Sequence, residues 1–190
     1  GDSASTVRVF IDANNNGLYD AGTEATATAT VNNGSWSVSG LSTSGLADGA
    51  YNVYAITTSA SGALSSSKSA ALNVTIDKTS PGMPSNAIVL STASDSGSSN
   101  ADGRTNVTNP TVRISLAGTN AAAGDTAELL LGGASLGTPV RLVLSGTDIS
   151  NGYVDMSVSS GDLGADGSKV LTAKITDVAG NIGTAGGSLT

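Results

Sequence analysis

The stretch ADGSKVLTAKITDVAG, residues 165–180, decides the fold, because it joins the pattern of a β-strand to the pattern of a turn. Its apolar residues Leu171, Ala173 and Ile175 alternate with polar ones, which is the period of a strand with one buried face. The stretch returns without a gap as ADGAYNVYAITTSASG, residues 47–62, at an offset of 118 residues (166 − 48 = 118). The sequence therefore predicts a repeated β-structural unit.

The same alternation runs through most of the chain. Clusters of Gly, Asn, Asp and Ser separate the alternating segments at short intervals, as turns between antiparallel strands require. No amphipathic helix is predicted, since the alanine run Ala121–Ala123 is short and is followed by Gly124. The fold class is therefore predicted to be all-β, and the strand spacing favours β-sandwiches. The other alternating apolar sets are Val7/Val9/Ile11, Trp36/Val38, Tyr51/Val53/Ala55, Val112/Ile114/Leu116, Val140/Leu142/Leu144 and Val154/Met156/Val158.

The repeat begins in the middle of a unit. Residues 78–123, with strands predicted near Ala87–Leu90 and Thr111–Gly118, have no counterpart in the first copy. We therefore expect residues 1–77 to form a sandwich domain that lacks its first strands, and residues 78–190 to form a nearly complete one.

The expected linker is TIDKTSPGMP, residues 75–84, because its two prolines oppose regular pairing. Its shortness predicts two domains placed end to end. A half sandwich exposes strand edges, so we expect either residues before Gly1 or another chain to supply the missing strands. Such a pattern is typical of an internal slice of a tandem array.

The composition excludes several classes of function. The chain contains no cysteine and no histidine, which excludes disulfides, the usual zinc sites and every Cys or His catalytic dyad. Only 8 Lys and Arg are scattered along a chain of net charge −7, so no nucleic acid partner is expected. No apolar run approaches the roughly 20 residues that span a bilayer, so no membrane contact is expected. A supply of oxygen ligands without soft ones suits a hard cation, above all Ca²⁺.

One loop has the spacing of a calcium site. In FIDANNNGLYD, residues 10–20, side-chain oxygens recur at every second position after a predicted strand. Thr23 stands where an EF-hand-type loop carries a bidentate Glu, and Glu24 follows one residue later. The alternative is an Asn-Gly β-turn, although this loop is longer than the Gly132–Ser135 turn of the other copy. Positions 1, 3, 5, 7 and 9 of the loop are Asp12, Asn14, Asn16, Leu18 (through its carbonyl) and Asp20, and Gly17 stands at the sharp turn.

A second candidate set lies in SDSGSSNADGRTN, residues 94–106. Asp95, Asn100 and Asp102 are its possible ligands, and the alternative is a solvated Gly- and Ser-rich loop.

A third candidate set depends on topology. Strand alternation in a sandwich brings the entry linker of the second domain to the same end as its last hairpin turn, so Asp77, Asp177 and Asn181 are expected at the domain junction, with the 12–20 loop facing it. A divalent cation would neutralise these carboxylates. The alternative is a surface turn in which Asp177 caps its own backbone.

The aromatic residues and the remaining carboxylates suggest no catalytic site. Trp36 lies in an alternating segment, so core filling is favoured over a carbohydrate platform formed with Tyr51 and Tyr54. Asp162 and Asp166 flank a Gly-rich turn and are interpreted as turn formers. The chain is therefore not expected to be an enzyme.

Three stretches in order resemble a known family. They are IDKTSPGMPSNAIVLSTASDSGSSNADGRTNVTNPTVRISLAG (residues 76–118), the turn TDVAGN (176–181) and the hairpin VRVFIDANNNGLYDAGTEATATATVNNGSWSVS (7–39). Together they resemble the bacterial immunoglobulin-like repeats of giant Bap-like and RTX-type surface adhesins exported by type I secretion.

The resemblance implies tandem immunoglobulin-like β-sandwich domains, end to end, that form a calcium-rigidified extender or stalk in cell adhesion and biofilm formation. It further implies an extracellular location, on the bacterial surface or secreted, with neighbouring Ig-like repeats of the same chain as partners. Two other hypotheses stay open. One is a surface-layer or fibre-forming subunit, and the other is a carbohydrate-binding accessory module of a secreted protein.

Overall fold

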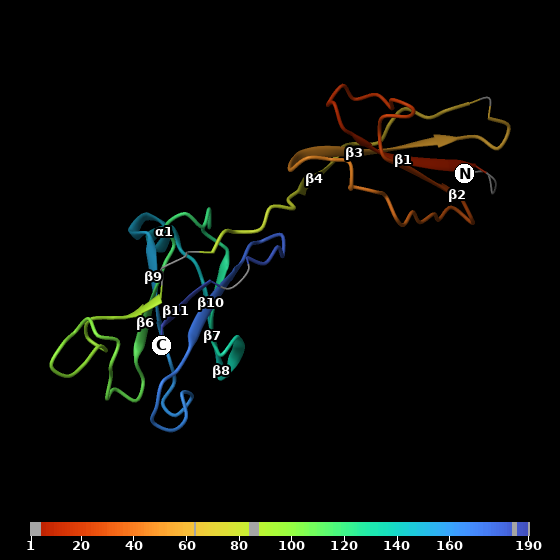
Figure 1. Ribbon diagram of the computed structural model, residues 1–190. Coiled ribbons are helices and arrows are strands. Elements are labelled where there is room, and N and C mark those ends of the chain that lie inside the picture. The colour runs from red at the N-terminus through yellow and green to blue at the C-terminus, as the bar shows by residue number, and fades with distance from the viewer. Residues whose placement is uncertain (1–4, 63, 84–87, 184–185, 190) are drawn as a thin grey trace. The chain divides into compact units, whose positions relative to one another are not determined.

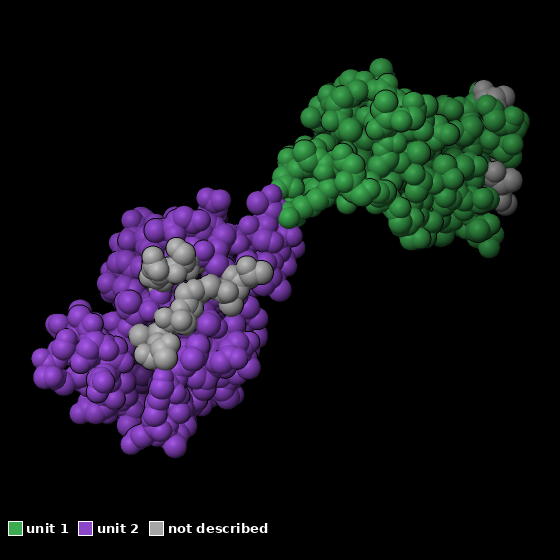
Figure 2. All heavy atoms as spheres, in the orientation of Figure 1, with its two compact units in different colours: residues 1–78 green, residues 79–190 purple. Residues whose placement is uncertain are grey.

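The computed structural model describes residues 5–62, 64–83, 88–183 and 186–189, and these are all-β except for one short helix (Figure 1). The all-β prediction is therefore confirmed. The chain divides into two compact units, residues 1–78 and 79–190, which we call the first unit and the second unit (Figure 2). No helix in the described part of the chain is long and apolar enough to cross a membrane.

The described residues of the first unit form one antiparallel sheet in the order β2-β1-β3-β4. Alternate residues divide it into two faces: Val9 lies opposite Ala27 and Ala55 on one face, and Phe10 lies opposite Thr26 and Tyr54 on the other. The strands are β1 (Thr6–Asp12), β2 (Thr26–Thr30), β3 (Gly49–Thr58) and β4 (Leu72–Ile76). The face that we call the apolar face of the first sheet carries Val7, Val9, Ile11, Ala27, Ala29, Val53, Ala55, Leu72 and Val74.

The second unit is a β-sandwich of two antiparallel sheets, ordered β11-β10-β7-β8 and β5-β6-β9. Both sheets contribute to one core, in which Ile114 of one sheet and Leu129 of the other are fully buried. The strands are β5 (Ile88–Leu90), β6 (Thr111–Ser115), β7 (Thr126–Leu131), β8 (Ala134–Val143), β9 (Tyr153–Ser157), β10 (Leu171–Thr176) and β11 (Gly186–Leu189).

The repeat seen in the sequence is also present in the strand registers. Val9 of β1 lies opposite Ala55 of β3, and Leu129 of β7 lies opposite Ala173 of β10. The offsets are 120 residues for the first strand (129 − 9 = 120) and 118 for the second (173 − 55 = 118). The sheet β2-β1-β3-β4 therefore corresponds, strand for strand, to β8-β7-β10-β11.

The structure differs from the sequence-based predictions in two elements. A helix, α1 (Gly146–Asn151), was not predicted; a capping box between Ser145 and Asp148 starts it, and Gly152, in the left-handed region, ends it. The strand predicted at Trp36 and Val38 is wrong, because this segment pairs only through an isolated bridge upstream, between Asn32 and Ser35.

The strand predicted near Ala87–Leu90 corresponds to β5 from Ile88 on, and Ala87 lies outside the described residues. The strand predicted at Thr111–Gly118 is confirmed as β6, which ends earlier, at Ser115.

Candidate metal centre

The loop with calcium-like spacing connects β1 to β2. It occupies residues 13–25, whereas only Gly132 and Gly133 connect the equivalent strands β7 and β8. The structure therefore confirms that the first copy carries the longer connection.

Two buried carboxylates hold the loop closed. Asp12 is 1% exposed, and its Oδ1 and Oδ2 accept hydrogen bonds from the backbone N–H groups of Asn16 (3.1 Å) and Gly17 (2.8 Å). Glu24 is 7% exposed, and its Oε1 and Oε2 accept from the N–H groups of Ala13 and Asp20, both at 3.0 Å. Glu24 therefore points into the loop. A residue that replaced the bidentate Glu of an EF-hand-type loop, whose position Thr23 occupies here, would have to point the same way.

The exposed side of the loop is built from two amides and one carboxylate. The Asn14 and Asn16 side-chain amides both donate to Oδ2 of Asp20, each at 2.7 Å. A half-turn of each amide would exchange its nitrogen for its oxygen, so the same loop can present either donors or oxygen ligands. Leu18 donates its N–H to the Asn16 side chain at 2.7 Å, and its own side chain is exposed.

Two cationic side chains of the chain itself contact the loop, and the first is Arg8, whose guanidinium lies 4.6 Å from the centre of the Tyr19 ring. The second is Lys68, whose Nζ donates to the Gly17 carbonyl at 2.7 Å and lies 4.2 Å from the centre of the Tyr54 ring. The ion pairs found among the described residues do not include Asp12, Asp20 or Glu24. Two nearly buried carboxylates therefore share this loop without an ion pair to any described residue.

The donor set of the loop fits Ca²⁺ by its chemistry. Carboxylate, amide and carbonyl oxygens are the ligands that this ion takes, and a buried carboxylate without a counter-charge is costly. The described residues nevertheless contain no group of three or more His, Cys, Asp or Glu side chains gathered as a metal site. Any site in this loop would thus need its Asn and backbone oxygens as well as its carboxylates.

The second candidate set is brought together only in part. Asp95 is 7% exposed and accepts from the N–H groups of Gly103 (3.1 Å) and Arg104 (3.2 Å). Asp102 accepts from the same Arg104 N–H at 3.1 Å, so the two carboxylates lie together. Asn100 is exposed and takes no part in these hydrogen bonds within the described region.

The residues of the third candidate set belong to different units, so the junction site stays a prediction. Asp77 follows β4 in the first unit, whereas Asp177 and Asn181 form a turn after β10 in the second. Burial would raise the pKa of Asp177, but hydrogen bonds from the Asn181 side chain and backbone, at 2.8 Å each, help to hold that pKa below its usual value.

A buried charge cluster on β7 was not predicted. Glu128 is 4% exposed and is paired with Arg141 of β8 (3.1 Å) and Lys174 of β10 (3.0 Å), and Ser135 donates to it. Burial would raise the pKa of Glu128, but the hydrogen bonds from Ser135, Arg141 and Lys174 outweigh it and lower the pKa to about 2. Arg141 and Lys174 would repel a metal ion, so the Glu128 cluster is not a metal site. The sequence signals the cluster only by an acidic residue inside an otherwise apolar strand.

The prediction that Trp36 fills the core is wrong in this structure. Its side chain is 46% exposed, because residues 36–40 belong to no strand. Tyr54 packs at 5.7 Å from Phe10 beneath Lys68, and the Tyr51 hydroxyl donates to the Ala47 carbonyl. The neighbouring tyrosines are thus engaged with the protein itself and do not extend an exposed platform.

The comparisons with known proteins identify a family for most of the chain. Residues 82–190 match the family model described as bacterial Ig-like domain. No curated protein matches the chain.

Two solved structures are similar over nearly the whole chain. One is a tetra-tandem repeat in the extending region of a large adhesion protein, with 22% identity, a TM-score of 0.35, and coverage of 99% of this chain and 42% of that one. The other concerns host cell surface retention of a 1.5-MDa bacterial ice-binding adhesin, with 23% identity, a TM-score of 0.33, and coverage of 99% of this chain and 54% of that one. The chain thus spans about half the length of the solved chains that it matches.

Proposed function

Because the chain belongs to the bacterial Ig-like domain family, we propose that it serves as a pair of extender repeats in a bacterial surface adhesin. Its second unit is the immunoglobulin-like β-sandwich of this family, and the strand registers of the first unit repeat one of its two sheets. Repeats of this kind provide length and spacing between a cell and a distal binding domain.

The location and partners follow from this role. We propose an extracellular site of action, on the cell surface or in the secreted fraction, with neighbouring Ig-like repeats of the same protein as partners. Export by type I secretion and a contribution to biofilm formation belong to the same proposal, which rests there on the resemblance to Bap-like and RTX-type adhesins.

We further propose that the residues 12–24 loop binds Ca²⁺ and that the ion stiffens the first unit. The observation that supports this is the pair of buried carboxylates, Asp12 and Glu24, which form no ion pair with any described residue. Asp20 and the amide oxygens of Asn14 and Asn16 would complete the donor set. A bound ion stabilises the folded state by about 2.7 kcal/mol when its free concentration is a hundred times Kd.

The test combines thermal unfolding with an ion count. Melting in EGTA and then in millimolar calcium should show a rise of several degrees, and titration calorimetry should show binding heat. Replacing Asp12 and Asp20 together by alanine should remove one ion from the metal content measured by mass spectrometry. Asp166→Ala, an exposed carboxylate outside the candidate sets, is the matched control and should leave the ion count unchanged.

Two results would contradict the calcium proposal at different levels. An unchanged ion count in the Asp12/Asp20 double variant would make the loop a turn and leave other sites in question. Absence of both binding heat and a melting shift in the unmodified chain would remove calcium from the account altogether, while the extender role would stand.

A further inference from the structure

The sequence contains three Asn-Gly pairs, and all of them lie among the described residues: 16–17, 33–34 and 151–152. Asn-Gly is the dipeptide most open to deamidation, because a glycine without a Cβ lets its backbone nitrogen approach the preceding side-chain amide. The reaction requires that both the glycine nitrogen and the asparagine side chain are free to move. The hydrogen bonds around each pair therefore decide which of the three can react in the folded protein.

The pair in the loop between β1 and β2 is held on both sides. The Gly17 N–H donates to Oδ2 of the buried Asp12 at 2.8 Å. The Asn16 side chain is fixed at both of its polar atoms, since Nδ2 donates to Asp20 and Oδ1 accepts from the Leu18 N–H, each at 2.7 Å. The nitrogen that would attack and the amide that it would attack are thus both occupied.

The pair at the end of α1 is held through the backbone. Asn151 is the last residue of the helix, and the Gly152 N–H donates to the carbonyls of Asp148 (2.9 Å) and Ile149 (3.1 Å). The Gly152 carbonyl accepts from the Leu116 N–H at 2.8 Å. Both backbone groups of this glycine are therefore engaged.

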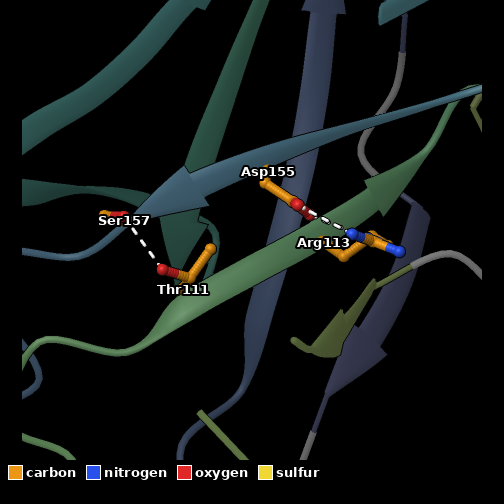
Figure 3. Close-up of polar contacts among 4 residues, drawn as sticks. All are labelled: Thr111, Arg113, Asp155 and Ser157. Atoms are coloured by element: carbon orange, nitrogen blue, oxygen red, sulfur yellow. Dashed lines mark hydrogen bonds and ion pairs between the residues drawn. The ribbon is translucent and has the colours of Figure 1, made fainter. Parts of the chain in front are cut away.

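The strand that follows Gly152 fixes this pair further. Figure 3 shows β9 held against β6 by a two-point ion pair between Arg113 and Asp155, with both N–O distances 2.8 Å, and by Thr111 beside Ser157 at 3.0 Å. Movement of Gly152 would disturb a paired strand, and local opening of paired strands is rare.

The third pair has no such support. Asn33 and Gly34 are the exposed central residues of a turn that is closed only by the bridge between Asn32 and Ser35, with hydrogen bonds of 2.8 and 2.9 Å. Within the described part of the chain, nothing accepts a hydrogen bond from the Gly34 N–H, and the Asn33 side chain forms none. Residues 36–40 that follow belong to no strand, so breaking two hydrogen bonds opens the turn.

The second and third pairs are a matched comparison. They occupy corresponding places in the two copies, at an offset of 118 residues (151 − 33 = 118). Gly34 and Gly152 also share the left-handed backbone, with φ of 78° and 74°. A difference in reactivity between these pairs must therefore come from their surroundings and not from the dipeptide itself.

We propose that Asn33 is a site of spontaneous deamidation in the folded protein, and that Asn16 and Asn151 are protected by the hydrogen bonds around their glycines. The Gly34 nitrogen gives up its proton and bonds to the side-chain carbonyl carbon of Asn33. The bond from that carbon to the amide nitrogen breaks, and ammonia leaves with the released proton. One water molecule then opens the cyclic imide to aspartate or isoaspartate.

The products change the turn in two ways. Either product adds a negative charge to a chain that already carries a net charge of −7. Isoaspartate also adds one carbon to the main chain at position 33, which the pairing of Asn32 with Ser35 does not accommodate. Because the lost ammonia is not restored, the modified fraction grows with the age of the molecule. The inference depends neither on the extender role nor on calcium.

The test compares the three pairs in one sample. The full chain is incubated in mildly alkaline buffer with EGTA, and tandem mass spectrometry locates each amide-to-acid change over time. Isoaspartyl methyltransferase labels the isoaspartate product. A parallel incubation in guanidinium chloride gives the rate of each pair in the unfolded chain. Asn33 should react at close to its unfolded rate, whereas folding should slow Asn16 and Asn151 more than about tenfold.

Two variants separate the chemistry from the protection. Asn33→Gln should remove the main product, because the larger imide ring of glutamine forms far more slowly. Asp12→Ala should speed the reaction of Asn16 and leave that of Asn33 unchanged; an Asn16 as slow as in the parent would refute protection by Asp12.

The unmodified chain decides the proposal without either variant. If folding slows Asn33 as much as the other two asparagines, or if Asn16 or Asn151 reacts faster than Asn33 in the folded chain, the proposal is overturned.

Discussion

Glu128 and Asp12 are both almost fully buried carboxylates, yet their surroundings differ. Glu128 lies between Arg141 and Lys174, two cations from the neighbouring strands. Asp12 accepts only backbone N–H groups, and so does Glu24. A buried charge is stabilised most when an opposite charge lies beside it. Glu128 already has such partners in Arg141 and Lys174, whereas Asp12 and Glu24 have only backbone N–H groups, which is why a bound cation is proposed for their loop.

The Glu128 cluster predicts a pH-dependent stability of the second unit. Its folded-state pKa of about 2 lies below the ordinary value of 4.5, so its ionised form stabilises the fold above pH 4.5. That contribution is lost as the pH falls from 4.5 through 2. Glu128→Gln should therefore cost about 3 kcal/mol at pH 7 and almost nothing near pH 2.

Urea unfolding followed by circular dichroism at the two pH values measures this difference. Asp166→Asn, at an exposed position, is the control and should change stability little at either pH. A Glu128→Gln variant as stable as the parent at pH 7 would show that the cluster contributes nothing to folding.

Gly17 allows a test of the loop that needs no ion. Its φ of +74° lies in the left-handed region, and a Cβ would stand 2.5 Å from Lys68 Nζ. Gly22 has a similar φ of +88° but nothing within 4 Å of its Cβ position. Gly22→Ala should cost about 1 kcal/mol of backbone strain alone, and Gly17→Ala should cost more because it also displaces Lys68.

Urea unfolding of the first unit, followed by Trp36 fluorescence, compares the two alanine variants. Equal losses would mean that the Lys68 contact with the Gly17 carbonyl adds no stability to the loop.

Among the elements, local pattern predicted strands well where the partner strand is present. β1, β3, β6, β8, β9 and β10 fall on the segments predicted from alternation, since each has a neighbouring strand with which to pair. Trp36 and Val38 follow the same pattern but form no strand. A strand needs a partner strand to pair with, and the local sequence pattern does not show whether one is present. The helix α1 was missed for the opposite reason, since six residues between Ser145 and Gly152 are ordered by their caps and carry no apolar periodicity.

The candidate site, like the strands, could be predicted from the sequence only in part. The spacing of Asp12, Asn14, Asn16 and Asp20 could be read from the loop itself. The inward turn of Glu24 depends on how the loop closes against Ala13, and the burial of Glu128 depends on β8 and β10. The turn of Glu24 depends on how the loop itself folds, and the burial of Glu128 depends on strands paired at long range, so the spacing of residues alone predicts neither.

Residues 33–39 (NGSWSVS) and 151–157 (NGYVDMS) are related in sequence, but only the second segment contains a strand, β9. This difference predicts unequal rates of amide hydrogen exchange. Amides of residues 153–157 are held in the ladder with β6, so they should exchange slowly. Amides of residues 36–39 belong to no strand and should exchange at nearly unprotected rates, despite the related sequence. Exchange measured by mass spectrometry or NMR checks both segments in one sample, and similar protection in the two would contradict the difference in pairing.

At the scale of the whole molecule, the two units bury unequal sets of apolar side chains among their described residues. The buried apolar cluster belongs entirely to the second unit, whereas the buried apolar residues described in the first are few: Val7, Phe10, Ile11 and Val31. Stability rises with the fraction of surface that a domain buries, so the first unit should be the less stable one. A bound ion would therefore add a larger share to the stability of the first unit than to that of the second.

Independent unfolding of the two units follows from this organisation. Leu129 is fully buried in the core of the second unit, so Leu129→Ala should destabilise that unit by about 2–5 kcal/mol. Trp36 lies in the first unit, and its fluorescence transition should stay where it is in the parent chain, while the circular dichroism transition of the second unit moves to lower urea. Phe10→Ala is the reciprocal variant, because Phe10 is fully buried against Tyr19 and Tyr54 of the first unit. It should move the Trp36 transition and leave the other in place. If both probes shift together in either variant, the two units unfold as one cooperative structure and the division at residues 78 and 79 has no energetic meaning.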